Sequence, residues 1–402
     1  MAQFPAPRSL TFRTAREADL DRLVEIHLAA YPSGRPAQAR RSFAAHPLGG
    51  FDALVVAELD GDLVAHAFLF ALETWFGGRA VKTGGIASVG VAPEVRGQGI
   101  ARALLAELHR RSDLRGDAMT MLYPFRQAFY AALGYAPTSP RKRIVFDPRA
   151  VPDSWRVAAR GSVRRARGED REAVVTIHRR TAAAASGWST RDEPMWNLLL
   201  SKEDRHVLLC EDGYVAFRLD QHEAHAKTIA YVVELVAATD AARRTLFGAL
   251  ATLRDQVAEV IVEVDVRDPI EHVLIDADAR AFGTGAVEHS LGELVGGPMV
   301  RIEDAHRAIE ARGYAADGAF DLVVEDDAMA MSVRVENGRA VVGPAKGGAS
   351  MRLSRSALAG ILYGGLTATD AARLGLAFAE ARTLARIDGV VAMPPVAPVD
   401  AF

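Results

Sequence analysis

The sequence predicts a protein of mixed helices and strands (α+β and α/β), with two copies of one fold followed by a different third domain. Three observations support this prediction. The chain has 402 residues, enough for two or three domains. The pattern Arg-x-Ala-Arg-x-x-Asp and the helix after it occur at 13–27 and recur at 164–178, 151 residues later. From about residue 298 the order of apolar segments changes.

The first copy begins with a short strand at 10–13, followed by apolar residues at helical spacing as far as His27. Asp60-Gly61 joins two apolar segments, 54–57 and 63–69, as in a β-hairpin. The elements expected next are a strand at 81–92, a helix at 98–112, a strand at 119–123, a helix at 125–133 ending at Gly134, and a strand at 144–146 that closes the sheet.

The stretch 86–111 carries the strongest chemical signal. Ile86–Val91 is apolar and β-branched, as in a buried strand, and Arg96-Gly97-Gln98-Gly99 then opens a helix. A glycine-rich turn at a helix N-terminus presents unpaired N–H groups and positive potential, which suits a pyrophosphate. The spacing matches neither a Walker loop nor a dinucleotide fingerprint. The alternative is an ordinary tight corner between a strand and a helix.

The second copy repeats the hairpin around Asp212-Gly213 and the strand at 231–236. Its turn before the next helix, Ala241-Ala242-Arg243-Arg244, contains no glycine. Side chains would stand where phosphates need open backbone, so this copy is expected to keep the fold without binding the pyrophosphate ligand of the first copy.

The third segment predicts a helix at 302–312 and strands at 320–325 and 330–335. Asn337-Gly338 is a strong hairpin turn. Strands at 340–342 and 351–353 and helical segments at 354–363 and 368–386 complete a mixed α+β unit.

Composition narrows the function. A net charge of −3 and a pI near 6.4 argue against binding nucleic acid through a basic field. The arginines between 141 and 191 are interleaved with acids and apolar residues, which favours a solvated domain junction. Cys210 is the only cysteine, so no intrachain disulfide is possible, and no spacing suggests a metal site. Without an apolar signal core or a membrane-length apolar run, a cytoplasmic protein is the default, although export by a non-standard route stays open.

The arrangement Val-x-Val-x-Pro-x-x-Arg-Gly-x-Gly-Ile-Ala, from Val89 to Ala101, resembles the acetyl-coenzyme A motif of the GNAT N-acetyltransferases. The third segment resembles a sterol-carrier-like fold in its element order. Together with the segment Tyr123–Tyr135 and the terminal Phe402, the whole chain resembles the enhanced intracellular survival (Eis) family. The resemblance implies an active GNAT domain at 1–150, a degenerate copy at 151–297 and a sterol-carrier-like domain at 298–402.

The resemblance also implies a function. Family members acetylate amines, notably on aminoglycosides or lysine side chains, and assemble as homohexamers. Tyr130 would protonate the leaving thiolate, and the terminal carboxylate of Phe402 would act as base. Acetyl-coenzyme A would be held by Val89, Gly90, Val91, Arg96, Gly97, Gln98, Gly99, Ile100, Ala101, Arg102, Phe125 and Arg126. This chain has Gly97 and Gln98 where the family often has basic residues, which could lower affinity for the coenzyme.

Alternatives remain from the residues alone. Tyr130 could be a core tyrosine packed on Gly134, and Phe402 the end of a frayed tail, although the prolines from Pro394 stiffen that tail. Glu25 and Glu58 are other possible bases. The chain could instead bind a lipid or sterol through its third segment, or sense acyl-coenzyme A without catalysis. The open glycine turn argues against a lipid- or sterol-binding protein. Tyr130 together with the apolar tail argues against a sensor of acyl-coenzyme A without catalysis.

Overall fold

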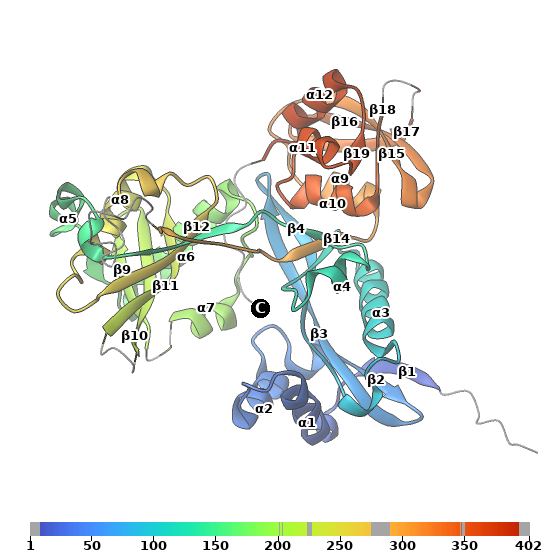
Figure 1. The fold of residues 1–402 in the computed structure, drawn as a ribbon, viewed down its shortest axis with the longest axis horizontal. Coiled ribbons are helices and arrows are strands. Elements are labelled where there is room, and N and C mark those ends of the chain that lie inside the picture. The colour runs from blue at the N-terminus through green and yellow to red at the C-terminus, as the bar shows by residue number, and fades with distance from the viewer. Residues whose placement is uncertain are drawn as a thin grey trace, which may run out of the picture.

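The computed structural model describes residues 9–393, apart from 201, 203, 223–226, 275–289, 346, 348 and 349. Within this part of the chain lie two seven-stranded sheets and one five-stranded sheet. Figure 1 shows the second sheet on one side of the molecule, and the first and third sheets on the other. The predicted class, two copies of one fold and a different third domain, is confirmed.

The first sheet has the strand order β1-β2-β3-β4-β5-β14-β6. Its strands are β1 (Leu10–Thr14), β2 (Leu54–Leu59), β3 (Asp62–Phe76), β4 (Arg79–Val91), β5 (Met119–Leu122), β6 (Ala136–Pro137) and β14 (Met299–Ile302). Its helices are α1 (Leu20–Ala30), α2 (Pro36–Ala45), α3 (Ile100–Arg115) and α4 (Gln127–Ala131). The β2–β3 hairpin turns at Asp60 and Gly61, both with positive φ, as its sequence predicts.

The second sheet has the order β13-β7-β12-β11-β10-β9-β8. Its strands are β7 (Arg141–Phe146), β8 (Arg164–Arg165), β9 (His206–Cys210), β10 (Gly213–His222), β11 (Lys227–Ala237), β12 (Glu259–Asp265) and β13 (Gly292–Val295). Its helices are α5 (Asp153–Ala159), α6 (Arg171–Ala184), α7 (Glu193–Leu200) and α8 (Asp240–Ala251).

The internal repeat is present in atomic detail. Arg13 forms a fork-like ion pair with Asp19, and that carboxylate also accepts the Arg16 N–H at 2.7 Å. Arg164 and Asp170 make the same pair, and Asp170 accepts the Arg167 N–H at 2.8 Å. The repeated sequence pattern therefore encodes one structure, a clamp that joins the first strand of each copy to its first helix.

One strand assignment is wrong. The segment 144–146 was expected to close the first sheet, but it lies in β7, which pairs with β12 and β13 of the second sheet. The first sheet is closed instead by β14, which pairs with β5 and β6 (Figure 1). An alternating apolar pattern defines a strand but not its partner, and here packing between the domains selected the partner. The boundaries at 150 and 297 remain predictions.

The third sheet has the order β17-β16-β15-β18-β19. Its elements are α9 (Ala305–Ala311), β15 (Gly318–Val324), β16 (Met329–Glu336), β17 (Arg339–Pro344), β18 (Ser350–Leu353), α10 (Arg355–Tyr363), α11 (Ala368–Arg373), β19 (Ala377–Phe378) and α12 (Ala381–Val391). The predicted helical segment 368–386 is two helices, because Gly375 adopts a φ of +71° and the chain turns into β19.

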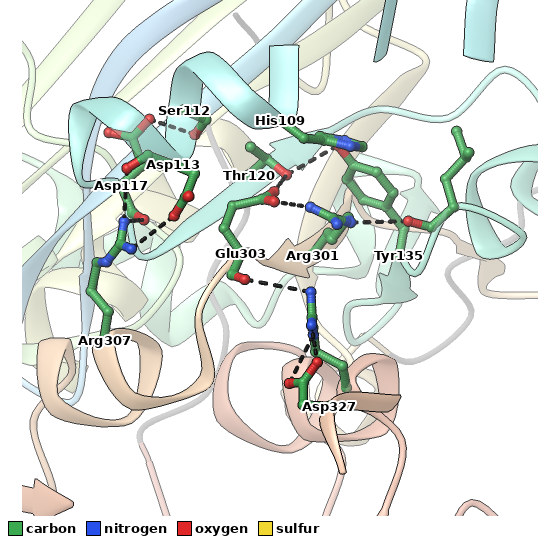
Figure 2. Close-up of polar contacts among 12 residues, drawn as sticks. His109, Ser112, Asp113, Asp117, Thr120, Tyr135, Arg301, Glu303, Arg307 and Asp327 are labelled. Atoms are coloured by element: carbon green, nitrogen blue, oxygen red, sulfur yellow. Dashed lines mark hydrogen bonds and ion pairs between the residues drawn. The ribbon is translucent and has the colours of Figure 1, made fainter. Parts of the chain in front are cut away.

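A buried polar network ties the first domain to the third (Figure 2). The Tyr135 hydroxyl contacts His109 Nε2 at 2.9 Å and Thr120 Oγ1 at 3.0 Å, and Thr120 donates to Glu303 Oε1 at 3.2 Å. Glu303 also pairs with Arg301. Arg355 of α10 donates to the Glu303 carbonyl at 3.4 Å and pairs with Asp327, and these contacts join the network to the third domain.

In the described ranges, no helix combines the length and the apolar character needed to cross a bilayer.

Candidate active site

The strands β4 and β5 form a parallel pair only over 83–86 and 119–122. Past this point β4 runs on to Val91, and in the described chain it has no further pairing with β5. A register shift against β3 falls at the same place, where Ser88 has a φ of +53°. This bulge and the separation of the strands leave the main chain of residues 87–91 facing an open V between β4 and β5.

A hollow of about 220 Å³ lies beside this V, at the start of α3. It is lined by Val91, Val95, Arg96, Gly97, Gly99, Ile100, Ala101, Arg102 and Phe129. Seven of these residues are ones the sequence predicts to hold the coenzyme. Val89 and Gly90 lie further back on β4, and Gln98, Phe125 and Arg126 are outside the lining of this hollow.

The two glycines of the turn are required by their backbone. Gly97 has a φ of +79° and Gly99 a φ of +82°, and a Cβ built on either one meets no atom within 4 Å. The turn is therefore open to a ligand, at the helix end where the first N–H groups of α3 have no partner within the helix.

Arg96 holds the turn in place. Its Nε donates to the Val91 carbonyl at 3.2 Å, and its Nη2 donates to the Ala29 carbonyl at 2.9 Å. These bonds tie the end of α1 to the end of β4. They give Arg96 a structural role, while its role toward a pyrophosphate remains a prediction.

Tyr130 is buried in an aromatic cluster on α4. Its ring makes edge-on contacts with Phe125 at 5.7 Å, Phe129 at 5.1 Å and Tyr135 at 5.9 Å between centroids. Burial raises the pKa of the Tyr130 hydroxyl well above its usual value, and the proximity of Tyr31 adds to the shift. Tyr130 therefore stays protonated throughout the neutral range, as a proton donor must.

The sequence analysis missed Tyr31. Its hydroxyl donates to the Val89 carbonyl at 3.2 Å, and its ring stacks on His27 at 4.7 Å. His27 Nδ1 in turn lies 3.1 Å from the hydroxyl of Ser88, the bulge residue. An aromatic residue directly after the predicted helix was the available signal, but nothing in the sequence places that helix against β4.

The proposed bases have different positions. Phe402 lies outside the described residues. Glu25 pairs with Arg22 at 2.8 Å, and Glu58 pairs with Arg13 at 2.7 Å. Each of these two carboxylates is engaged in an ion pair, which gives no reason to prefer either as a base.

The second copy differs at the corresponding helix start. The α8 N-terminus is capped by Thr239, whose hydroxyl accepts the Ala242 N–H at 3.1 Å. Arg243 covers the Phe247 ring at 4.7 Å and pairs with Asp268 at 2.5 Å. Side chains fill this helix start, in keeping with the prediction that it does not bind coenzyme A.

Comparisons with known proteins agree with this geometry. The acetyltransferase (GNAT) domain family matches residues 11–138, a second GNAT family matches 187–302, and the sterol carrier protein domain matches 305–399. The N-acetyltransferase Eis of Mycobacterium tuberculosis is 29% identical over 77% of this chain and 78% of its own length.

This chain is a homologue of the Eis N-acetyltransferases and contains two GNAT acetyltransferase domains.

An uncharacterized N-acetyltransferase of Streptomyces avermitilis is 27% identical over 82% of each chain. The same fold occurs in a GCN5-related N-acetyltransferase of Kribbella flavida, with a TM-score of 0.81 at 24% identity over 98% of this chain and 99% of that chain. It also occurs in Eis1 of Mycobacterium abscessus, with a TM-score of 0.77 at 21% identity over 98% and 100%. Acetyl-coenzyme A is the cosubstrate of GNAT enzymes.

Replacing Gly99 with valine is expected to raise the KM for acetyl-coenzyme A tenfold or more, because a branched side chain would enter the open turn. Gly161→Val is the matched control: Gly161 also has a positive φ of +76° and open space around its Cβ, but lies in the second domain. Steady-state kinetics at saturating amine measure the effect. Equal KM values for acetyl-coenzyme A in the two variants would show that this turn does not bind the coenzyme.

Three buried histidines are expected to make this enzyme sensitive to mild acid. Burial lowers the pKa of His66, His109 and His178 to about 3 each. In the unfolded chain these histidines have a pKa of ~6.5 and bind protons below that pH, whereas in the folded chain they stay neutral. The free energy of unfolding therefore decreases as the pH falls below ~6.5. Each histidine contributes a loss of about 1.4 kcal/mol per pH unit until its folded pKa is reached.

Urea unfolding at pH 7.5 and 5.5 measures this loss. The interval lies above the pKa values of Glu107 and Asp170, which ion pairs lower to about 2, so those carboxylates stay ionised. A free energy of unfolding that is unchanged between the two pH values would contradict the assignment of these histidines as neutral.

Proposed function

We propose that this enzyme transfers an acetyl group from acetyl-coenzyme A to a primary amine by direct attack in a ternary complex. The observation that carries the proposal is the combination of the V between β4 and β5 with the open glycine turn at its end and Tyr130 beside it. The pyrophosphate would lie on the turn of Gly97 and Gly99, and the pantetheine arm along Val89–Val91.

The reaction needs three groups in place. A main-chain N–H of Val89–Val91 would polarise the thioester carbonyl as the amine nitrogen attacks it. The C–S bond then breaks as the tetrahedral intermediate collapses, and the hydroxyl of Tyr130 gives its proton to the departing sulfur. The Tyr31 hydroxyl, bound to the Val89 carbonyl, would keep this strand segment in register.

The amine must lose a proton in the same cycle. We assign this to the carboxylate of Phe402 on the strength of the family resemblance. A terminal carboxylate with a pKa near ~3.5 is a weak base toward an ammonium ion, so it would act as an acceptor, through water or after desolvation has raised its pKa. From the same resemblance we propose that the enzyme assembles as a homohexamer. We also propose that its acceptor is an aminoglycoside-like polyamine or a lysine side chain.

The test is release of free thiol from acetyl-coenzyme A in the presence of a panel of primary amines. The full chain is expected to release thiol only when an amine is added, and the acetylated amine is expected to appear in equal amount by mass spectrometry. Deleting Phe402 is expected to lower the rate with every accepted amine. Thiol release that never requires an amine, or a protein that binds acetyl-coenzyme A but acetylates nothing, would overturn the proposed function.

A further inference from the structure

A second, larger cavity lies in the second domain, where that domain borders the first. Its volume is about 1000 Å³, and its walls come mainly from β7, β11, β12 and the segment 188–205, with Tyr123 from the first domain. It is distinct from the hollow at the glycine turn, since no residue lines both.

The cavity is the second copy's counterpart of the V. The strands β11 and β12 pair in parallel only over 229–231 and 259–261, and residues beyond that pairing on both strands line the cavity. The duplicated fold thus keeps the opening between its two central strands, while α8 closes the helix start where phosphates would bind. The opening is available for another ligand.

The charge of this cavity is unusual for a binding site for cationic drugs. Of the described residues that line it, seven are arginine or lysine and five are aspartate or glutamate. The sequence analysis took the arginines at 141–191 for a solvated junction, yet Arg191 is 6% exposed and Arg141 is 16% exposed. Four of these arginines pair with acids of the same wall, and Arg218 pairs with Asp220 at 3.2 Å, so among the described residues the net positive charge of the wall rests on Lys202 and Arg205. That net charge favours an anion in the cavity.

Most of the acidic side chains in the wall are already engaged. Glu234 pairs with Arg191 at 2.6 Å and accepts the Tyr214 hydroxyl at 2.5 Å. Glu263 is shared by Arg143 at 2.8 Å and Arg141 at 3.0 Å. These acids are therefore held by cations of the wall and would not be free to receive an incoming ammonium group.

Arg205 stands out among the cations. Its Nε and Nη1 atoms are buried, and neither has a hydrogen-bond partner within the described part of the chain. Burial lowers the pKa of Arg205, the charges of Asp204 and Glu234 oppose this shift, and the charge of Arg218 adds to it. A buried guanidinium donor left without an acceptor is destabilising, and an incoming anion would relieve that cost.

Tyr123 is the residue of the first domain that lines the cavity in the described part of the chain. This residue follows Leu122, the last residue of β5 paired with β4, and so lies where the V of the first domain opens. Main-chain bonds fix the two domains here, since Trp75 N–H donates to the Trp188 carbonyl at 2.8 Å and Gly187 N–H donates to the Trp75 carbonyl at 2.8 Å.

We propose that this cavity binds an acidic group of the acetyl acceptor, so that the preferred acceptors are amines that also carry a carboxylate or a phosphate. The inference rests on the proposed function and narrows its acceptor class: of the acceptors that the resemblance implies, it disfavours the aminoglycoside-like polyamine. A polycationic amine would meet like charge in the wall, whereas an acidic amine would place its anion near Arg205 and Arg218 and its amine toward Tyr123 and the V.

The experiment compares three amines of one chain length: 6-aminohexanoate, hexylamine and 1,6-diaminohexane. At low salt and a fixed concentration of acetyl-coenzyme A, we expect kcat/KM for 6-aminohexanoate to exceed that for 1,6-diaminohexane tenfold or more. This difference should come from KM for the amine. Phosphoethanolamine against ethylenediamine, measured in the same way, distinguishes a phosphate from a carboxylate.

Arg205→Gln is expected to raise the KM for 6-aminohexanoate about tenfold, with little change in kcat or in the kinetics of hexylamine. Arg205→Lys keeps the charge and should retain most of the preference. Arg334→Gln is the control, because Arg334 is an exposed arginine of the third domain. Its preference should equal that of the unaltered enzyme.

A preference for 1,6-diaminohexane, or a preference for the acid that survives Arg205→Gln, would overturn the proposal and leave acetyl transfer itself intact. Calorimetry with the product analogue 6-acetamidohexanoate gives a reading that does not depend on turnover. Binding that is lost in Arg205→Gln and kept in Arg334→Gln would support the site. No binding to the unaltered protein would overturn it.

Discussion

Replacing Tyr130 with phenylalanine is expected to lower kcat by about 10²–10⁴-fold with little change in the KM for acetyl-coenzyme A. The ring would still fill its place against Phe125, Phe129 and Tyr135, so the cluster should stay packed. Only the proton for the departing sulfur would be missing. Because burial raises the pKa of Tyr130, the unaltered enzyme should show no fall in rate from its ionisation up to about pH 10.

Tyr135→Phe is the matched control. It removes a hydroxyl from the neighbouring ring, but that hydroxyl binds His109 and Thr120 in the network of Figure 2. We expect lower stability with kcat within a few-fold of the unaltered value. Stopped-flow measurement of thiol release at saturating substrates separates the two variants. If Tyr130→Phe kept full kcat, Tyr130 would be a core tyrosine without a catalytic role, which is the alternative that the sequence pattern around it also allows.

Replacing Arg312 with alanine is expected to destabilise the third domain by about 3–5 kcal/mol. Arg312 is fully buried, and it donates to the carbonyls of Gly313 at 3.1 Å, Leu362 at 2.7 Å and Val391 at 2.9 Å. Leu362 and Val391 lie in the last turns of α10 and α12, where the helix dipoles favour a positive charge. Removing the guanidinium would leave three buried carbonyls unsatisfied.

Differential scanning calorimetry and hydrogen exchange in β15 and α12 measure this loss. Arg312→Lys should recover little, because one ammonium group cannot reach three carbonyls that point from different directions. Arg334→Ala, an exposed position in the same domain, should change stability by less than about 0.5 kcal/mol. A third domain that unfolds at the same temperature with and without Arg312 would show that packing alone holds α9, α10 and α12 together.

Local features of this enzyme could be predicted well. The hairpin at Asp60-Gly61 and the turn of Gly97 and Gly99 depend on positive φ angles that glycine favours, so the residue type and the backbone carry the same information. The repeated Arg–Asp clamp was visible because it spans only a few residues in each copy. The Tyr130 candidate came from resemblance, since its own spacing indicated no more than a core residue.

Contacts between distant segments decided the rest. The strand at 141–146 pairs in the second sheet and not in the first, and the strand at 299–302 pairs with β5 in the first sheet. The apolar pattern of a strand does not specify which sheet it joins. The charge of the cavity depends on arginines of β7, β10 and α8 meeting those on either side of α7 in one wall, which no local pattern records. The sequence alone determined the repeated fold and the open glycine turn of its first copy, while tertiary packing determined which strands close each sheet and which charges line the cavity of the second domain.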